Sequence, residues 1–331
     1  MHEQWSRRGF LRTGAATGLV VLAGSMGLMA CSSHKPPPDG SRGGEPVTIT
    51  HVFGETSISE PPKRVISAGL TGQDDLLALG VVPIAITNWF GDQPFAVWPW
   101  AQPKLGNAKP VVLSLDNGIQ VAQIARLKPD LIVATDAGLD QDTYQKLSAI
   151  APTIAQSDGY PFFEPWKVQA SAIGQAVFQP DQMKSLIDNV DHSFTGLADR
   201  YPQFKNKTVL LLQGMLSKGS VVAITGWRAE FLTQMGLTVA TSVASLAVDP
   251  EHALVPADKI KSVLGVADLL IWTTDNDADQ AALLANPAIA TLKARSVFTT
   301  ADQAGAIAFS SPLSFPLVAD QLPPMIAKIL R

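Results

Sequence analysis

The chain has 331 residues, of which 46% are hydrophobic and 16% are charged, and its formal net charge is −4. This length and composition are sufficient for two domains with ordinary cores, and they exclude a disordered or fibrous protein. The mildly acidic balance argues against nucleic acid as a ligand.

Residues 1–30 have the pattern of an export signal. Residues 6–11, SRRGFL, resemble the twin-arginine consensus, and after Arg12 an uncharged run extends from Thr13 to Ala30. Such a segment directs export and is not a membrane span of the mature protein. We therefore expect the folded part of the chain to lie outside the cytoplasmic membrane.

Cys31, the sole cysteine, ends a segment, LMAC, that resembles a bacterial lipobox. In this motif the cysteine becomes lipidated and the preceding residues are removed, although Met29 is uncommon there. Residues 31–46 are rich in proline and glycine, and we expect them to form a flexible tether that joins the lipid to the folded part. The alternative is an uncleaved anchor helix, which also holds the protein at the outer face of the membrane.

Short apolar runs alternate with helical patterns over residues 47–165, which predicts an N-terminal α/β lobe with a mostly parallel sheet. The expected strands are 47–50, 64–68, 81–87, 131–135 and 153–156, and the expected helices are 73–79, 119–127 and 144–150. The long loop 88–106 carries five aromatic residues. Long loops inside compact domains are typically functional or mobile.

A long amphipathic helix is predicted over residues 180–202. Apolar residues between Met183 and Tyr201 recur at helical spacing, Asp181 can cap the start and Pro202 stops the helix. Twenty residues at ~1.5 Å each span roughly 30 Å, about the width of a small domain. With a helix expected over 166–177, this gives a bridging helical segment, 166–202, and a cleft between two lobes as the expected site of function.

Residues 203–331 repeat the alternation and are expected to form a C-terminal α/β lobe. The expected strands are 208–212, 237–240, 268–274 and 297–300, and the expected helices are 227–235, 258–264 and 311–330. The predicted fold class is therefore α/β, with two lobes that have mostly parallel sheets and are joined by one long bridging helix.

Several segments occur in an order that resembles one family. They are 49–54 and 62–66, 74–81, 127–132, 146–153, 267–272 and 310–314. Over residues 47–331 the sequence resembles the periplasmic binding lipoproteins that serve ABC importers of iron-siderophores and cobalamin. The resemblance implies that a monomer captures a ferric siderophore in the interlobe cleft and delivers it to an ABC permease, with modest hinge motion.

The same resemblance implies docking on the permease through one acidic residue on each lobe. Asp258 occupies roughly that position on the second lobe. On the first lobe Ala122 stands where a glutamate is common. We therefore expect Asp258 to dock on the permease, without the acidic residue that is usual on the first lobe.

Ligands of parallel α/β lobes sit beyond the carboxyl ends of the strands. The loops predicted there expose many aromatic rings, which is costly unless something covers them. The expected ligand contacts are aromatic or can bond an oxygen of a chelate: Trp89, Trp98, Trp100, Tyr160, Phe163, Trp227, Arg228, Ser310 and Phe315. Arg228 could pair with carboxylate or phenolate oxygens. The alternative for each ring is packing on its own lobe, and for Ser310 it is capping of the last helix.

Other functions are compatible with parts of the sequence. A heme carrier of the same fold is the first alternative, with Tyr160 as axial ligand, and cobalamin is a further possible ligand. An exported α/β enzyme lacks support, because no G-x-S-x-G, P-loop, G-x-G-x-x-G after a strand or H-E-x-x-H motif occurs. A lipoprotein that binds only another protein is the third alternative. No histidine pair has metal-ligand spacing, so we expect no resident metal. Because no catalytic motif occurs, we also expect no catalytic residue and no cofactor.

Overall fold

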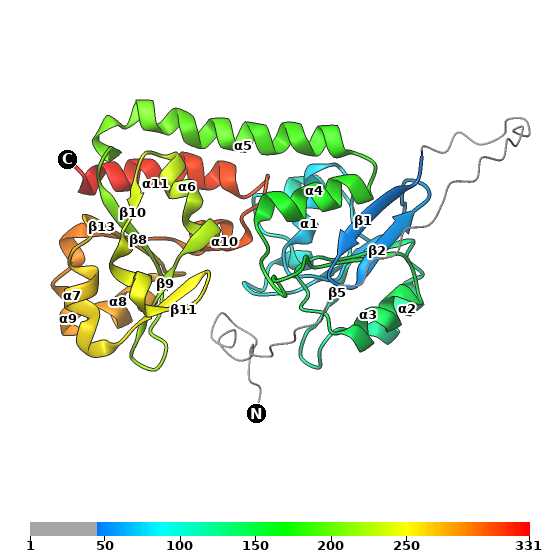
Figure 1. Cartoon of the computed structure of the whole chain (residues 1–331), viewed down its shortest axis with the longest axis horizontal. Coiled ribbons are helices and arrows are strands. Elements are labelled where there is room, and N and C mark those ends of the chain that lie inside the picture. The colour runs from blue at the N-terminus through cyan, green and yellow to red at the C-terminus, as the bar shows by residue number, and fades with distance from the viewer. Residues whose placement is uncertain (1–44) are drawn as a thin grey trace, which may run out of the picture.

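A computed structural model describes residues 45–331, which form two lobes with helix α5 (Pro180–Arg200) running along both (Figure 1). The expected export signal, the lipobox with Cys31 and most of the tether lie outside the described residues. Within residues 45–331, no helix is both long and apolar enough to cross a membrane.

The N-terminal lobe is built on a five-stranded sheet in the order β5-β4-β3-β6-β7, in which every pair is parallel. Its strands are β3 (Val65–Ser67), β4 (Ala85–Thr87), β5 (Val111–Leu113), β6 (Leu131–Ala134) and β7 (Thr153–Ala155), and its helices are α1 (Gly72–Ala78), α2 (Val121–Leu127) and α3 (Gln141–Ser148). A separate antiparallel hairpin joins β1 (Val47–His51) to β2 (Gly54–Ile58). Pro83, which has no N–H to donate, interrupts the run that was expected to be a strand from residue 81, so β4 is shorter than predicted.

The C-terminal lobe holds a seven-stranded sheet in the order β11-β12-β9-β8-β13-β14, with β10 paired to β8. Its strands are β8 (Thr208–Gln213), β9 (Val221–Ile224), β10 (Thr238–Val239), β11 (Ala247–Asp249), β12 (His252–Val255), β13 (Leu269–Thr273) and β14 (Ser296–Phe298). The strands β8, β10, β13 and β14 pair in parallel, as predicted, while β9, β11 and β12 add antiparallel pairs. The helices are α6 (Glu230–Gln234), α7 (Ile260–Leu264), α8 (Asp277–Leu284), α9 (Pro287–Ala290), α10 (Ala301–Phe309) and α11 (Phe315–Ile329).

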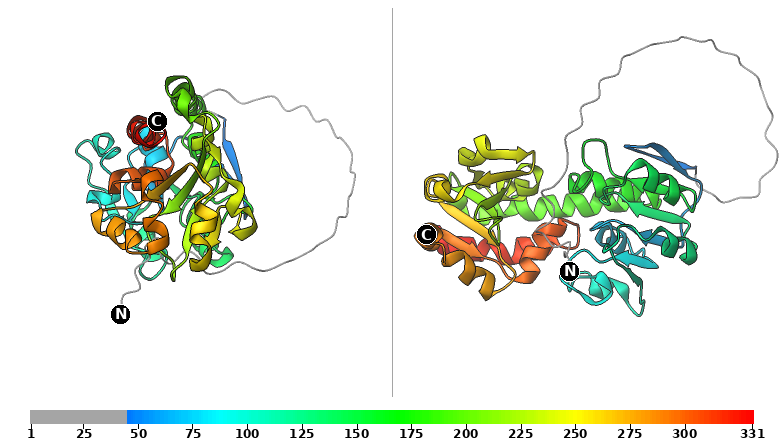
Figure 2. Two further views of the ribbon diagram at one scale, coloured as in Figure 1. Left: turned by 90° about the vertical axis from the view of Figure 1, so that its left-hand side faces the viewer. Right: turned by 90° about the horizontal axis from the view of Figure 1, so that it is seen from below.

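The predicted bridging segment is present as α4 (Trp166–Ala176) followed by α5, and the views in Figure 2 show α5 reaching from one lobe to the other. The expected cap was wrong: Asp181 lies in the first turn, and the helix begins at Pro180 after Gln179 without a side-chain cap. Proline suits this position because its fixed φ is helical and its missing N–H is one that has no helical partner.

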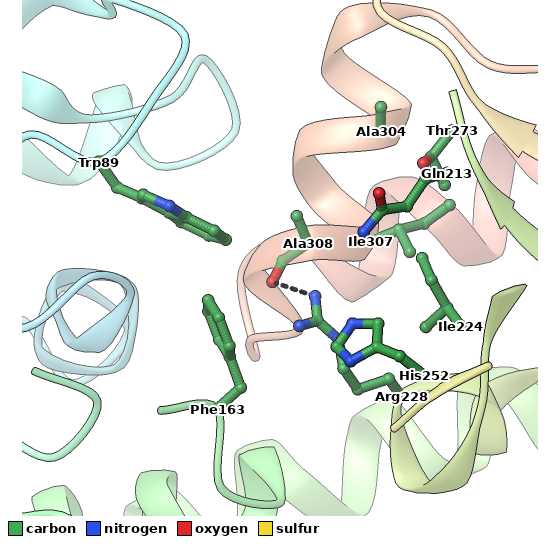
Figure 3. Close-up of a pocket in the computed structure, with 10 residues that line it drawn as sticks. All are labelled: Trp89, Phe163, Gln213, Ile224, Arg228, His252, Thr273, Ala304, Ile307 and Ala308. Atoms are coloured by element: carbon green, nitrogen blue, oxygen red, sulfur yellow. Dashed lines mark hydrogen bonds between the residues drawn. The ribbon is translucent and has the colours of Figure 1, made fainter. Parts of the chain in front are cut away.

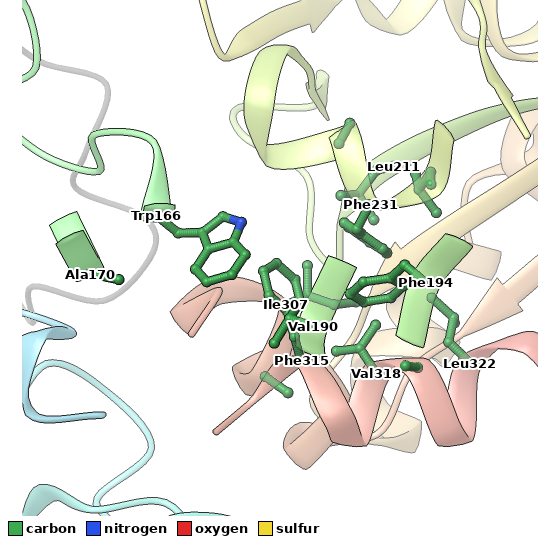
Figure 4. Close-up of a cluster of buried hydrophobic side chains, with 14 of the residues drawn as sticks. Trp166, Ala170, Val190, Phe194, Leu211, Phe231, Ile307, Phe315, Val318 and Leu322 are labelled. Carbon is green, nitrogen blue, oxygen red and sulfur yellow. The ribbon is translucent and has the colours of Figure 1, made fainter. Parts of the chain in front are cut away.

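One apolar core runs through both lobes, and Figure 4 shows the part of it around Phe315. Phe315, at the start of α11, lies 5.3 Å from Trp166, 5.3 Å from Phe194 and 5.8 Å from Phe231, measured between ring centroids. Phe315 was expected to contact the ligand, and its ring is instead buried in this core. Since α4, α5, α6 and α11 all contribute to the core, the lobes are joined by much more than one helix.

A second contact between the lobes is made by loop 88–106. Trp98 is 2% exposed, stacks on Trp100 with centroids 5.0 Å apart, and lies against Gly91 and Gly305. Because Gly305 belongs to α10 of the other lobe, a ring of the N-terminal lobe is inserted against the backbone of the C-terminal lobe. Trp98 was expected to contact the ligand, and its ring is instead packed against Trp100 and against the glycines of both lobes.

This insertion predicts an unusual response to a glycine replacement. Gly305→Ala should lower the free energy of unfolding by about 1–3 kcal/mol, since the new Cβ would lie 2.7 Å from the Trp98 ring. The matched control is Gly196→Ala in α5, where nothing lies within 4 Å of the new atom. That helical replacement should stabilise the protein by about 0.5–1 kcal/mol. Urea unfolding of both variants makes the comparison, and equal stabilities would contradict the close packing.

Candidate functional site

The first pocket, here called the Arg228 pocket, lies between the lobes and has a volume of about 60 Å³ (Figure 3). Trp89 and Phe163 line it from the N-terminal lobe. The C-terminal lobe contributes Gln213, Ile224, Arg228, His252, Thr273, Ala304, Ile307 and Ala308. Gln213 and Thr273 are the last residues of β8 and β13, so the pocket lies where ligands of parallel sheets bind.

Arg228 is a cation of the C-terminal lobe whose side chain reaches Phe163 of the N-terminal lobe. Its guanidinium carbon lies 4.6 Å from the centroid of the Phe163 ring, which is within the range of a cation–π contact, and Nη2 donates a hydrogen bond to the carbonyl oxygen of Ala308 at 3.5 Å. The turn before it requires glycine, because Gly226 has a φ of 62° and a Cβ there would lie 2.7 Å from the Pro250 carbonyl oxygen. The backbone thus fixes where the guanidinium emerges.

The titratable side chains near Arg228 are those of Glu251, which is acidic, and His252, which is neutral. Glu251 accepts a hydrogen bond from Trp227 Nε1 at 2.8 Å, and burial raises the pKa of this carboxyl while Arg228 opposes the shift. Burial and the nearby Arg228 lower the pKa of His252, whose Nδ1 lies 3.1 Å from both carboxylate oxygens of Asp249. His252 is therefore neutral at neutral pH, and among the described residues that line the pocket Arg228 alone is charged.

A larger cavity, here called the Phe162 pocket, has a volume of about 220 Å³ and lies within the N-terminal lobe. Its lining residues are Ala68, Leu70, Trp89, Leu115, Gly118, Ile119, Ala137, Gly138, Leu139, Asp140, Thr143 and Phe162. Trp89 lines both pockets, so its half-buried ring is their shared wall. Gly138 has a φ of 60°, and a Cβ there would lie 2.0 Å from the Phe162 ring, so the close approach of that ring depends on glycine.

Three of the predicted ligand contacts line the Arg228 pocket: Trp89, Phe163 and Arg228. Trp227 lies beside Arg228, with its ring centroid 5.9 Å from the guanidinium carbon, and lines neither pocket. Tyr160 is partly exposed and also lines neither pocket, so the structure gives no support to its expected contact with ligand or heme.

The two remaining predicted contacts have structural partners. Ser310 is buried and ends α10 in a left-handed conformation, with Oγ donating to the Ile307 carbonyl oxygen at 2.7 Å. The alternative that Ser310 caps the last helix was wrong, because α11 begins after Ser314. Its contact with a ligand stays a prediction. Trp100 donates from Nε1 to the carboxylate of Asp74 at 2.7 Å, which places it in the contact between the lobes.

Sequence reasoning did not single out Gln213, His252 or Thr273 as ligand contacts, and of the residues that line the Phe162 pocket it named Trp89 alone. Gln213 and Thr273 could have been found, because each polar residue ends or nearly ends a predicted apolar strand. His252 begins β12, a short strand without a clear alternating pattern, so no local signal marked it.

Buried carboxylates lie beside the contact between the lobes. Asp74 Oδ2 accepts from Trp100 and, across the lobes, from Ser311 Oγ, both at 2.7 Å. Complete burial raises the pKa of Asp74 to about 6 although these hydrogen bonds oppose the shift, and burial raises the pKa of Glu164 to about 7. Burial raises the pKa of Asp75 well above its usual range, and the neighbouring carboxylates add to the effect.

No group of three or more histidine, cysteine, aspartate or glutamate side chains in residues 45–331 is arranged to hold a metal ion. The acidic residues at the start of α1 are tied into the fold: Asp75 accepts from Gln169 Nε2 at 2.9 Å, and Asp74 is bonded as described above.

Two lobes, a bridging helix and pockets at strand ends define a solute-binding protein. The family described as periplasmic binding protein matches residues 65–304, and the chain belongs to this family. Members of this family are binding proteins, so membership argues against the exported enzyme.

Related proteins and structures agree with this assignment. A periplasmic solute binding protein from Mycobacterium smegmatis is 59% identical and has a TM-score of 0.82, over 86% of this chain and 99% of that chain. Streptococcus pneumoniae PiaA in complex with ferrichrome shares the fold, with a TM-score of 0.72 at 23% identity over 86% of this chain and 98% of that chain. The probable siderophore-binding lipoprotein YfiY of Bacillus subtilis is 28% identical, and the match spans 66% of this chain and 65% of that relative.

The raised pKa of Asp74 predicts a pH-dependent stability. Between pH ~4 and ~6 the folded protein holds a proton that the unfolded chain has released, so the free energy of unfolding falls as pH rises through this range. Asp74→Asn keeps an acceptor for Trp100 and Ser311 but does not titrate. Relative to this variant, the parent should lose roughly 2–3 kcal/mol of stability between pH 4.5 and 7.5, measured by urea unfolding.

The comparison with Asp74→Asn removes the contribution of other groups. Burial lowers the pKa of His51 and of His252, so both histidines act in the opposite sense over part of this range. Their effect is common to both proteins and cancels in the difference. Parallel pH profiles for parent and variant would show that Asp74 does not titrate as described.

Proposed function

We propose that this protein captures a ferric siderophore in the cleft between its lobes and delivers it to an ABC importer from the outer face of the membrane. The observation that carries the proposal is the position of Arg228, a cation that faces Phe163 and Trp89 of the opposite lobe in a pocket at the ends of parallel strands. The names of relatives support it: YfiY is described as a siderophore-binding lipoprotein and FecB of Escherichia coli as an Fe(3+) dicitrate-binding protein.

The chemistry of the cleft suits a ferric chelate. Siderophores bind iron through oxygens of carboxylate, hydroxamate or phenolate type, and a guanidinium donates well to such oxygens. Covering roughly 400 Å² of apolar ligand surface is worth about 10 kcal/mol, and association costs at least ~4 kcal/mol. The difference corresponds to affinity of only tens of micromolar. Tight capture therefore depends on the charged contact that Arg228 supplies.

The alternatives lack an observation in their favour. A heme carrier was expected to use Tyr160 as axial ligand, and Tyr160 lines neither pocket. A lipoprotein that binds only another protein was expected to leave its loop aromatics exposed. Trp98 and Phe163 are instead buried, and Trp89 and Trp100 are partly buried against other rings.

The proposal includes attachment of Cys31 to a lipid and a tether formed by the residues up to 46. The sequence of the lipobox supports attachment, and two of the relatives from Bacillus subtilis are named lipoproteins. A tether of this composition lets the folded part reach a permease in the same membrane.

Loss of the Arg228 charge tests the capture step. Arg228→Gln should weaken the binding of ferric citrate about 10- to 100-fold, because a hydrogen bond to a charged group contributes about 1.5–3 kcal/mol. Quenching of intrinsic tryptophan fluorescence during titration with ferric citrate, a ferric trihydroxamate and heme measures the affinities. The control is Arg200→Gln at the end of α5, which is exposed. Unchanged affinity of Arg228→Gln for all ferric chelates would contradict the proposal.

Delivery is tested separately from capture. Asp258 is exposed in the short helical turn Ala257–Lys259, and we propose that it contacts the permease. Asp258→Lys should leave fluorescence titrations unchanged and reduce siderophore-dependent iron uptake by cells that carry the variant. Asp277→Lys, an exposed acidic residue in the first turn of α8, is the control. Equal uptake by both variants would exclude Asp258 from docking.

A further inference from the structure

We infer that the ligand of this cleft is a ferric chelate with two unlike ends: an anionic part that reaches Arg228 and a neutral apolar arm that enters the Phe162 pocket. This inference rests on the proposed function and names the class of chelate within it. It follows from the chemistry of the two pockets and from the ring of Trp89 that they share.

The lining of the Phe162 pocket favours an apolar group. Leu70, Leu115, Ile119 and Leu139 line it together with the rings of Trp89 and Phe162 and with alanine and glycine residues. Thr143 and Asp140 are its polar lining residues. The carboxylate of Asp140 caps helix α3 by accepting from the Thr143 backbone N–H at 2.7 Å, so its hydrogen-bonding capacity is partly used within the protein.

The charged residues of the two pockets also assign the anionic part to Arg228 and the neutral arm to the Phe162 pocket. Asp140 is exposed at the edge of the Phe162 pocket, and hydrogen bonds from Thr143 lower the pKa of this carboxyl, so it is negative at neutral pH. No lysine, arginine or histidine is found among the described residues that line this pocket. An anionic arm would meet a like charge here, whereas at Arg228 it meets a cation.

The volumes assign the larger group to the Phe162 pocket. A cavity of about 150 Å³ is sufficient for benzene in an engineered protein. The Phe162 pocket, at about 220 Å³, has room for one aryl ring or a short acyl chain. The Arg228 pocket, at about 60 Å³, admits a carboxylate-sized group and not a ring.

The test uses ferric chelates that differ only in their arm. One ferric citrate dihydroxamate, whose iron centre carries a net negative charge, is prepared with a terminal amine that is acylated with acetyl, butyryl, hexanoyl, benzoyl or succinyl groups, and each complex is titrated against the full chain by tryptophan quenching. Affinity should rise about fourfold for each added methylene until the pocket is filled. The succinyl arm, which has the length of the butyryl arm but ends in a carboxylate, should bind more weakly than butyryl.

Variants locate the arm. Ala137→Leu narrows the Phe162 pocket and should reduce the ratio of hexanoyl to acetyl affinity toward one, and Leu115→Trp is a second narrowing variant if the first does not fold. Ala308→Leu makes the same change in size in the Arg228 pocket and should leave that ratio unchanged, whatever its effect on absolute affinity. A thermal melt of each variant confirms folding.

The possible results separate this inference from the proposed function. If the acetyl complex binds and longer neutral arms give no gain, the inference is wrong and capture of ferric chelates stands. If the gain appears and persists in both narrowing variants, the arm lies elsewhere and the inference is again wrong. If no ferric chelate of any kind quenches, the proposed function fails and this inference fails with it.

Discussion

The contact between the lobes constrains everything else in this structure. Trp98 of the N-terminal lobe lies against Gly305 of α10, and Asp74 accepts a hydrogen bond from Ser311 across the same contact. One apolar core also continues through both lobes. Separation of the lobes would expose this core and remove the hydrogen bond that Ser311 donates to the buried Asp74 carboxylate, which is costly. The cleft is therefore largely preformed, and ligand capture requires little ordering of the protein.

A preformed cleft allows a division of chemistry between its two ends. Arg228 emerges from a turn fixed by Gly226 and faces Phe163, so the cation is held in place before a ligand arrives. Beyond Trp89 the lining becomes apolar and its edge becomes acidic. A ligand that is anionic at one end and apolar at the other fits this pattern, while a ligand that extends a second anionic group beyond Trp89 meets the acidic edge of the Phe162 pocket.

Sequence reasoning succeeded where a pattern is local. The spacing of apolar residues located α5, and the buried strands β6 and β13 were visible as continuous apolar runs. It failed where the outcome depends on contacts between distant segments. Trp98 and Trp89 lie in one loop, and no local pattern shows that the first packs against Gly305 of α10 while the second lines the cleft. For the same reason no local pattern shows that Phe315 and Tyr160 line neither pocket.

The central claim is that a ferric chelate sits in the cleft with its anionic part at Arg228. A crystal structure of the complex with ferric citrate, recorded at the iron absorption edge, tests this directly because iron gives an anomalous signal that no protein atom shares. The account predicts an iron peak in the cleft beside Trp89, Phe163 and Arg228, with an oxygen of the chelate entering the Arg228 pocket and accepting a hydrogen bond from the guanidinium. An iron peak away from these residues, in a protein that binds the chelate in solution, would contradict it.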